Sequence, residues 1–294
     1  MPELPDVTVY REALEARLSS ATLTRLELHN PFVLRTVEPG VADVEGQRVT
    51  GIERIGKRIV FALDGELFVV LHLMIAGRLR WLAEAAKAPA RITLAVLVFD
   101  AGRLAFTEAG TKRRASLHIV HGRGALAQFE AGGIEVLQAD LATFSSRLTA
   151  ANHTLKRALT DPHLFAGIGN AYSDEILHRA KLSPIALTQK LTREAIAQLY
   201  AATREVLEEW TARLRNEAAG RFPEHVTAFR PEMAVHGKFG EPCPVCGTRV
   251  QRIVYAENEC NYCARCQTGG RILADRSLSR LLHASWPRSI DALE

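Results

Sequence analysis

The chain has 294 residues, of which 47% are hydrophobic and 24% charged, and its formal net charge is +4 at pH 7. This is the composition of an ordinary globular protein, long enough for one large domain or two of common size. The most apolar run, residues 67–76, is about half of a membrane span, and the first residues lack a signal-peptide pattern. We therefore expect a cytoplasmic protein and no membrane partner, while the mild positive charge permits a nucleic-acid partner without requiring one.

The first 120 residues are predicted to be one helix followed by many strands. Val7, Tyr10 and Leu14 recur at helical spacing within residues 5–19. From residue 21 the pattern changes to short β-rich runs separated by turn signals. These runs are TLTRLELH, RIVFAL, ELFVVLHL, ITLAVLVF and RLAF. Several strands without helices between them predict a sandwich or a barrel.

The second half of the chain is predicted to be helical, with a different module at its end. Apolar residues recur every three or four positions from about residue 143 to 215. The next stretch, RNEAAGRFPEHVTAFRPEM, is irregular and polar, so we expect a mobile loop there. A cysteine module and a tail follow. The order is therefore β-rich, then helical, then metal-binding.

The cysteines give the strongest single signal. All five lie between residues 243 and 266, four of them in CPVC and CARC pairs separated by sixteen residues. Such pairs can place four thiolates tetrahedrally around zinc. The predicted ligands are Cys243, Cys246, Cys263 and Cys266. Disulfides are the alternative in an oxidising compartment, and an iron–sulfur cluster is another, although the ferredoxin spacings are absent.

A zinc ion with four thiolate ligands has no open coordination position, so it is structural and catalysis must lie elsewhere. Cys260, the fifth cysteine, is interpreted as a packed bystander rather than a ligand.

The segment FAGIGNAYSDEI, residues 165–176, predicts a tight glycine turn between two helices. Asn170 is placed to cap the second helix, and backbone N–H groups at that helix end would face a phosphate. Lys156, on the preceding helix, could add a charge to the same phosphate. Alone the pattern is weak, because glycine turns join helices in many proteins that do not bind nucleic acid.

The N-terminus MPELPDV offers a nucleophile. Methionine before a small residue is normally removed, which would expose Pro2 as a secondary amine. An α-amino group titrates near 7.7–8.0, so part of it is neutral at pH 7. A neutral amine can attack C1′ of a nucleoside and form a Schiff base, and Glu3 could protonate the sugar ring oxygen.

Two basic segments remain. Lys57 lies at a turn between strands, and residues 112–114 form the run KRR. Either one is commonly only a solvated charge.

Together these segments resemble the Fpg/Nei family, the formamidopyrimidine-DNA glycosylases and endonuclease VIII, from residue 2 to about 267. The matching segments, in the family's order, are MPELPDV, IGKRI, HLMIAGRL, KRALTDPHLFAGIGNAYSDEIL, HGKFGEPCPVCGT and CARCQ. The MPELP start is similar to the Fpg branch rather than to the MPEGP start of bacterial endonuclease VIII.

The resemblance implies a multidomain α+β enzyme that acts as a monomer on double-stranded DNA containing damaged bases or abasic sites. It implies an N-terminal β-sandwich with a leading helix, a helix-two-turn-helix domain and a C-terminal β-hairpin zinc ribbon with one structural zinc. The corresponding segments are 1–131 for the catalytic sandwich, 132–142 for a linker, 143–235 for the helix-two-turn-helix domain, 236–267 for the zinc finger and 268–294 for an extension.

The resemblance also implies residue roles. Pro2 corresponds to the Schiff-base nucleophile and Glu3 to the proton donor. Lys57 corresponds to the hairpin lysine that contacts a phosphate beside the damaged site and assists β-elimination. Lys156 and Asn170 correspond to the phosphate contacts of the helix-two-turn-helix region. Such an enzyme must extrude its target nucleotide, because C1′ is inaccessible to an in-line amine within the base stack.

Two departures from the family concern DNA contacts. The family fills the extrusion gap with Met, Arg and Phe, from HLGMSG and DPRRFG. Here HLMIAG places Ile75 at the Met position and Met74 at a glycine position, and EAGTKRRAS offers Arg113 or Arg114 as the arginine, with Ala115 near the position of the phenylalanine.

The zinc finger of the family carries an arginine five residues before the third cysteine, which grips phosphates and assists δ-elimination. Here Asn258 occupies that position and Cys260 replaces a threonine. A neutral amide offers no bidentate cation.

The leading hypothesis is a base-excision-repair DNA glycosylase with AP lyase activity on oxidised purines such as 8-oxoguanine and formamidopyrimidines, ending at β-elimination. The alternatives are an endonuclease VIII-like enzyme for oxidised pyrimidines, a non-catalytic protein that binds damaged DNA, and a generic zinc-ribbon DNA-binding protein. The last leaves the N-terminus unexplained.

Overall fold

The computed structural model describes residues 1–83, 86–110, 112–224, 226–255, 258–275, 279–281 and 286–292. The chain splits into two compact units, of which unit 1 comprises Met1–Ala131 and Trp210–Thr227, and unit 2 comprises Gly132–Glu209 and Ala228–Glu294. The two units are described separately below. Among the described residues, no helix is both long and apolar enough to cross a membrane.

Unit 1 is built on an eight-stranded antiparallel sheet with the order β5-β7-β6-β1-β2-β3-β4-β8. Its strands are β1 (Thr22–Leu28), β2 (Gln47–Ile55), β3 (Arg58–Leu63), β4 (Leu67–His72), β5 (Gly77–Leu82), β6 (Thr93–Phe99), β7 (Gly102–Glu108) and β8 (Ser116–His121). β1 and β2 pair at only two positions, Thr22 with Arg48 and Leu23 with Gln47. The sheet can therefore fold there into two four-stranded layers, the predicted sandwich.

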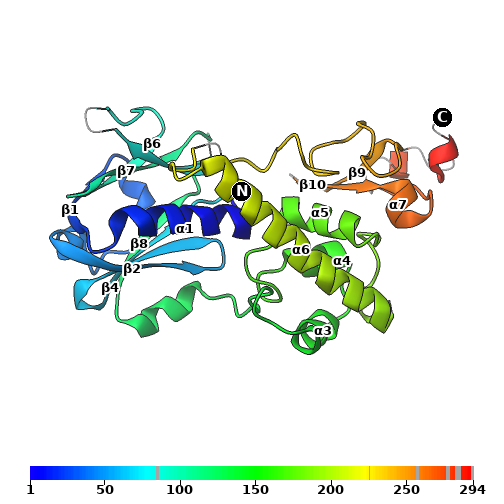
Figure 1. Cartoon of the computed structure of the whole chain (residues 1–294), viewed down its shortest axis with the longest axis horizontal. Helices are drawn as coiled ribbons and strands as arrows, with labels where there is room; N and C mark the ends of the chain where they lie inside the picture. The colour runs from blue at the N-terminus through cyan, green and yellow to red at the C-terminus, as the bar shows by residue number, and fades with distance from the viewer. Residues whose placement is uncertain are drawn as a thin grey trace. The chain divides into compact units, whose positions relative to one another are not determined.

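The main core of unit 1 draws on both layers and on the leading helix. α1 (Leu4–Leu18) lies against β2 and β3 (Figure 1). It buries Val7, Tyr10, Leu14 and Leu18 in that core, as their helical spacing predicts. Short helical elements complete this part of the chain: η1 (Pro31–Val33), α2 (Val41–Val44), η2 (Asp64–Glu66) and η3 (Arg123–Phe129).

The stretch after α6 (Arg193–Ala218) differs from the expected polar loop. Phe222 and Val226 are buried in the core of unit 1. The Phe222 ring centroid lies 5.6 Å from that of Tyr10 and 6.2 Å from that of Trp81. Two apolar side chains thus anchor a segment whose average composition is polar.

Unit 2 contains the helices of the predicted DNA-binding region and the zinc ribbon. The helices are α3 (Leu141–Thr149), α4 (Leu155–Thr160), α5 (Asn170–Arg179), the part of α6 up to Glu209, and the short η4 (Thr188–Lys190). α3 begins two residues inside the segment expected to be a linker. α5 packs against both α4 and the ribbon strand β10 (Asn258–Cys263).

The ribbon consists of β9 (Val250–Tyr255) paired with β10, followed by α7 (Ala264–Thr268) and the tail, which includes η6 (Ile290–Ala292). The tail packs on the ribbon. Leu273 and Ile290 form a buried cluster with Tyr262, and the Leu273 N–H donates to Tyr262 Oη at 2.7 Å. The extension is therefore a structural part of the ribbon.

Candidate functional site

The N-terminus of unit 1 lies in a buried, charged environment. Pro2 and Glu3 are both buried, and Glu3 is only 2% exposed. Glu3 is the N-cap of α1, and its N–H donates to Asp6 Oδ2 at 2.9 Å. The helix start therefore holds the Glu3 backbone in place beside the chain end.

The α-amino group of Met1 has a lowered pKa. Burial is the largest cause, because it penalises the charged form, and the nearby cations Arg78 and Lys57 act in the same direction. The carboxylates of Glu3 and Asp6 oppose the shift. The amine of Met1, Glu3 and Lys57 thus share one neighbourhood.

Lys57 lies in the turn between β2 and β3 and is half-buried. Gly56 before it has a φ of +57°, which favours glycine. The neighbouring strands add further basic groups, since Arg58 pairs across the sheet with His72. Burial, together with Arg58 and Lys57, lowers the pKa of His72 to about 4, so its imidazole is neutral at pH 7.

The turn between β4 and β5 presents the candidate wedge. Ile75 is 57% exposed, and Met74 before it has a φ of +52°, which fits a position where the family has glycine. The Gly77 N–H donates to Leu73 O at 2.8 Å, and a Cβ on Gly77 would lie 2.1 Å from that oxygen. Only glycine fits at position 77, so the sequence strongly determines the backbone of this turn. The turn leaves the Ile75 side chain exposed.

The second wedge segment lies between β7 and β8. Arg113 and Arg114 are exposed, and Arg113 donates to Arg91 O at 2.7 Å. Ala115 is buried, and its N–H donates to Glu108 Oε2 at 3.1 Å. Ala115 therefore belongs to the core, and the two arginines are side chains that this segment presents to solvent.

The glycine turn of unit 2 differs from the prediction in one respect. Asn170 is the first residue of α5, and the N-cap is Gly169, whose backbone is extended. The expected cap at Asn170 is therefore wrong. Its side-chain amide instead donates to the backbone oxygen of Glu259 in β10 at 2.9 Å, which ties the start of α5 to the zinc ribbon.

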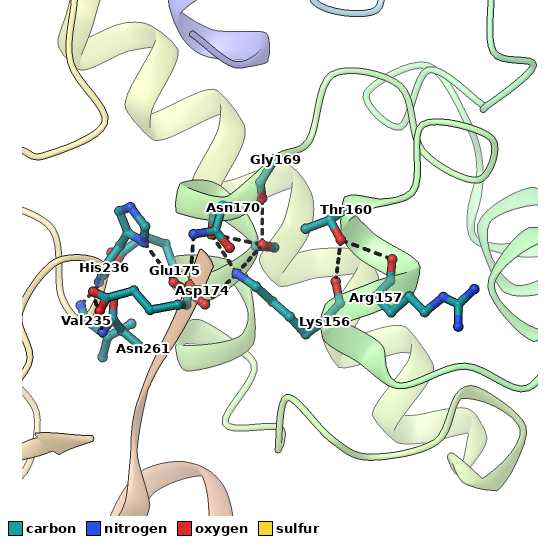
Figure 2. A network of polar contacts seen from close by, with 12 residues as sticks. Lys156, Arg157, Thr160, Gly169, Asn170, Asp174, Glu175, Val235, His236 and Asn261 are labelled. Carbon is teal, nitrogen blue, oxygen red and sulfur yellow. Dashed lines mark hydrogen bonds and ion pairs between the residues drawn. The ribbon is translucent and has the colours of Figure 1, made fainter. Parts of the chain in front are cut away.

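Lys156 is buried and forms three contacts inside unit 2 (Figure 2). Its Nζ donates to Asn170 O at 2.7 Å, to Ser173 Oγ at 2.8 Å and to Asp174 Oδ1 at 2.6 Å. Burial alone would lower the pKa of Lys156, but Asp174 raises it above its ordinary value. A lysine has three N–H donors, so a direct phosphate contact would require Lys156 to leave one of these partners.

Two carboxylates of α5 hold the segment that leads into the ribbon. Asp174 Oδ2 lies 2.8 Å from His236 Nδ1, and Glu175 accepts the N–H groups of Ala234, Val235 and His236 at 2.8 to 2.9 Å. Figure 2 shows this network between α5 and the ribbon segment. Asp174 thus lies between two basic side chains, which fixes the orientation of both.

The four predicted zinc ligands converge. The Sγ atoms of Cys243, Cys246, Cys263 and Cys266 all lie within 4.8 Å of one another. Cys243 and Cys266 are 3.9 Å apart and Cys246 and Cys263 are 3.4 Å apart. A tetrahedral zinc with Zn–S bonds of about 2.3 Å separates its sulfurs by about 3.8 Å, so the cluster fits one structural zinc.

Two residues near the cysteine cluster, His178 and Cys260, have environments that indicate their roles. His178 Nε2 of α5 lies 3.3 Å from Cys243 Sγ, a contact typical of groups that orient metal-bound thiolates. Cys260 is 2% exposed, and burial raises its pKa well above the ordinary value. This agrees with its interpretation as a packed thiol. Asn258 pairs with Tyr255 at the start of β10, and its side chain lies outside the described parts.

Comparisons with known proteins agree over nearly the whole chain. Residues 1–115 match the formamidopyrimidine-DNA glycosylase N-terminal domain, residues 133–216 its H2TH domain, and residues 240–269 the zinc finger found in FPG and IleRS. The formamidopyrimidine-DNA glycosylase of Chloroflexus aurantiacus is 34% identical over 279 residues, covering 91% of this chain and 98% of that protein. The chain belongs to the formamidopyrimidine-DNA glycosylase family.

Solved structures of Fpg proteins have the same fold. Lactococcus lactis Fpg in a complex with DNA containing an abasic site matches with a TM-score of 0.80 and 26% identity over 90% of this chain and 99% of that one. The Fpg (MutM) protein of Thermus thermophilus matches with a TM-score of 0.74 and 32% identity over 90% and 98%. The predicted fold, structural zinc, DNA partner and class of enzyme, a DNA glycosylase and AP lyase, are thereby confirmed.

Sequence reasoning missed several residues that build these sites. Four of them, Arg78, His72, Asp174 and His236, lie inside the segments that resemble the family but were given no role there, and His178 lies just after one of those segments. The spacing of Asp174 and His178 on one helix is the only local signal, since residues four apart share a helix face. Their partners lie far away in sequence, so the structure was needed to find them.

Proposed function

We propose that this Fpg family member excises oxidised bases in base-excision repair through a Schiff base on Pro2. Removal of Met1 is part of the proposal, because it exposes the secondary amine. Glu3 protonates the deoxyribose ring oxygen, and Lys57 binds a phosphate beside the damaged nucleotide and assists β-elimination. The observation that carries the proposal is the buried Glu3 beside the α-amino group of Met1, whose pKa is lowered by burial, Arg78 and Lys57; removal of Met1 places the new amine one residue further on, at Pro2, next to Glu3.

The chemistry follows from this arrangement. The neutral amine of Pro2 donates its electron pair to C1′ while the bond from C1′ to the base breaks, and the proton that the amine nitrogen then loses balances the proton that the base takes as it leaves. Glu3 gives a proton to the ring oxygen, the ring opens, and an iminium forms between Pro2 and C1′. The iminium acidifies the C2′ proton, whose loss expels the 3′ phosphate. Lys57 favours that step by pairing with the phosphate charge.

Two observations support oxidised purines and formamidopyrimidines as substrates. The relatives that match nearly the whole chain are formamidopyrimidine-DNA glycosylases, and one Lactococcus lactis Fpg structure holds DNA containing Fapy-dG. Another holds DNA containing an oxidised pyrimidine, which favours the second candidate, an activity toward oxidised pyrimidines. Experiments must decide between oxidised purines with formamidopyrimidines and oxidised pyrimidines as the preferred substrates.

Unit 2 is proposed to anchor the DNA backbone at the start of α5. In this proposal Lys156 acts on the DNA through Asn170, whose carbonyl it holds, because its ammonium has three partners within the protein. The positive end of the helix dipole at α5 favours a phosphate there. The zinc supplies a rigid β9–β10 hairpin. Ile75, with Arg113 or Arg114, is proposed to fill the gap left by the extruded nucleotide.

Trapping of the Schiff base tests the catalytic proposal. The protein is incubated with oligonucleotides that contain 8-oxoguanine, dihydrouracil or an abasic site, and borohydride is added. We expect a covalent adduct for the wild type and none for Pro2→Gly. Glu15→Gln changes an exposed carboxylate of α1 and serves as the matched control for Glu3→Gln. If the wild type, with its N-terminus shown by mass to start at Pro2, forms no adduct with any lesion, the protein is a non-catalytic DNA-binding member.

Product analysis tests the proposal for Asn258. The family arginine at this position assists δ-elimination, and a neutral amide provides no cation for that step. We expect products that end at β-elimination, and an increased share of δ-product in Asn258→Arg. Efficient δ-elimination by the wild type would contradict this part of the proposal while leaving the Schiff base intact.

A further inference from the structure

Arg78, the second residue of β5, bonds to the backbone of three places in unit 1. Its Nη1 donates to Ile75 O at 3.1 Å and to Gly77 O at 2.7 Å. Its Nε donates to Val226 O in the segment after α6. One side chain therefore joins the turn that presents Ile75 to the segment anchored by Val226.

Within the part of the chain that the structure describes, the charge of Arg78 has no direct counter-ion. Its hydrogen-bond acceptors are backbone carbonyls, and no carboxylate among the described residues lies within ion-pair distance of its guanidinium. A guanidinium stays protonated in proteins. A permanent positive charge is therefore fixed, by three hydrogen bonds, at a set place close to the chain end.

Four charged groups lie close to the α-amino group of Met1, one residue before the proposed nucleophile Pro2. Glu3 and Asp6 come from the start of α1, Lys57 from the β2–β3 turn and Arg78 from β5. The two carboxylates favour the ammonium form, and the two cations disfavour it. In the proposed function the charge of Lys57 pairs with a DNA phosphate. Arg78 is therefore the cation of this set whose charge is not paired with DNA.

We propose that Arg78 is a positioning residue that holds the Ile75 turn and the Val226 segment around the N-terminal amine, and whose uncompensated charge favours the neutral, nucleophilic form of that amine. The inference rests on the proposed function, because it concerns the same nucleophile. It adds Arg78, a residue of the HLMIAGRL segment to which the resemblance assigns no role.

The pH dependence of Schiff-base formation tests the charge. Borohydride trapping on saturating abasic-site DNA is measured across the range in which an α-amino group titrates, about pH 6 to 9. The rate rises with pH as the amine loses its proton. In Arg78→Gln we expect the midpoint of this rise to move upward by about 0.5 to 1 pH unit, the size expected for loss of one partly screened neighbouring charge.

Two variants separate charge from shape. Arg78→Lys keeps the charge and should restore the wild-type midpoint, although it cannot reproduce the guanidinium geometry. Arg80→Gln removes an exposed cation from the same strand and should leave the midpoint unchanged. An unmoved midpoint in Arg78→Gln, or an equal shift in Arg78→Lys, would overturn the electrostatic part. Absence of any wild-type adduct would instead count against the proposed function itself.

Limited proteolysis tests the holding role. Arg221 is exposed in the segment that Val226 anchors, so trypsin can report on opening of that segment. We expect faster cleavage after Arg221 in Arg78→Gln than in the wild type or in Arg80→Gln. Equal cleavage rates in all three proteins would overturn the holding role.

Discussion

Replacement of Asp174 by Asn tests how the glycine turn of unit 2 is held. The side chains of Lys156 and Asp174 are 7% and 0% exposed, and Nζ lies 2.6 Å from Oδ1. Asn keeps the shape of the side chain but leaves the ammonium buried without its counter-charge. Removing one partner of a buried pair costs about 3–5 kcal/mol, and His236 loses its carboxylate in the same change.

A surface ion pair provides the matched control. Arg179 and Glu209 are 2.7 Å apart, but both side chains are 43% exposed. Exposed pairs of this kind contribute about 0–1 kcal/mol. Glu209→Gln should therefore change stability little, although it removes the same kind of contact from the same unit.

Hydrogen exchange of the α5 amides is the appropriate assay, because it reports local opening in a protein of two units. A loss of about 3 kcal/mol corresponds to exchange more than a hundredfold faster. If Asp174→Asn accelerates exchange no more than Glu209→Gln does, the pair contributes as little as an exposed one. The inference that Lys156 holds the turn from within the protein would then be wrong.

Three further predictions concern the zinc site, His72 and the tail. His178→Phe removes the contact to Cys243 and should speed chelator-driven zinc release roughly tenfold; unchanged release would show that the contact does not orient the thiolate. Because burial lowers the pKa of His72 to about 4, the unfolded chain binds a proton between about pH 6.5 and 4 that the folded chain does not. Stability should thus fall as pH falls through this window, by about 3 kcal/mol; a urea-unfolding midpoint with the same pH slope in His72→Gln would refute the assignment. Leu273→Ala should destabilise the ribbon by about 2–3 kcal/mol, since Leu273 is buried against Tyr262; an unchanged exchange rate of the β10 amides would show that the tail does not brace the ribbon.

The parts of the fold that depend on local pattern could be predicted from the sequence. The zinc site follows from two CxxC pairs, because the spacing itself brings the thiolates together. α1 follows from the spacing of its apolar residues. The N-cap of α5 was misplaced by one residue, because Gly169 and Asn170 are both acceptable caps and only the backbone conformation decides between them.

Contacts between residues that are far apart in the sequence could not be predicted from local patterns. Asp174 and His236 are 62 positions apart, and nothing in the local pattern of either residue indicates the other. Phe222 lies in a polar stretch, so average composition suggested a loop, yet a single aromatic side chain is enough to anchor a segment in a core. Lys156 was expected at a phosphate because it lies on the helix before the glycine turn and matches a phosphate contact of the family. A buried lysine is rare, and the burial of Lys156 depends on the carboxylate of Asp174 on the next helix.

The proposed catalytic residues and the proposed DNA-anchoring residues lie in different units. Pro2, Glu3 and Lys57 belong to unit 1, whereas Lys156 and Asn170 belong to unit 2. A change that loosens only the unit 2 network should weaken DNA binding and make its salt dependence shallower, because fewer phosphate contacts remain well placed. It should not move the pH midpoint of trapping once DNA is saturating, because the groups around the amine are unaltered. Asp174→Asn should therefore change the binding assay and Arg78→Gln the pH profile. If Asp174→Asn shifted the pH midpoint, the network around α5 would have to act on the nucleophile, and the separation of roles inferred from the two units would fail.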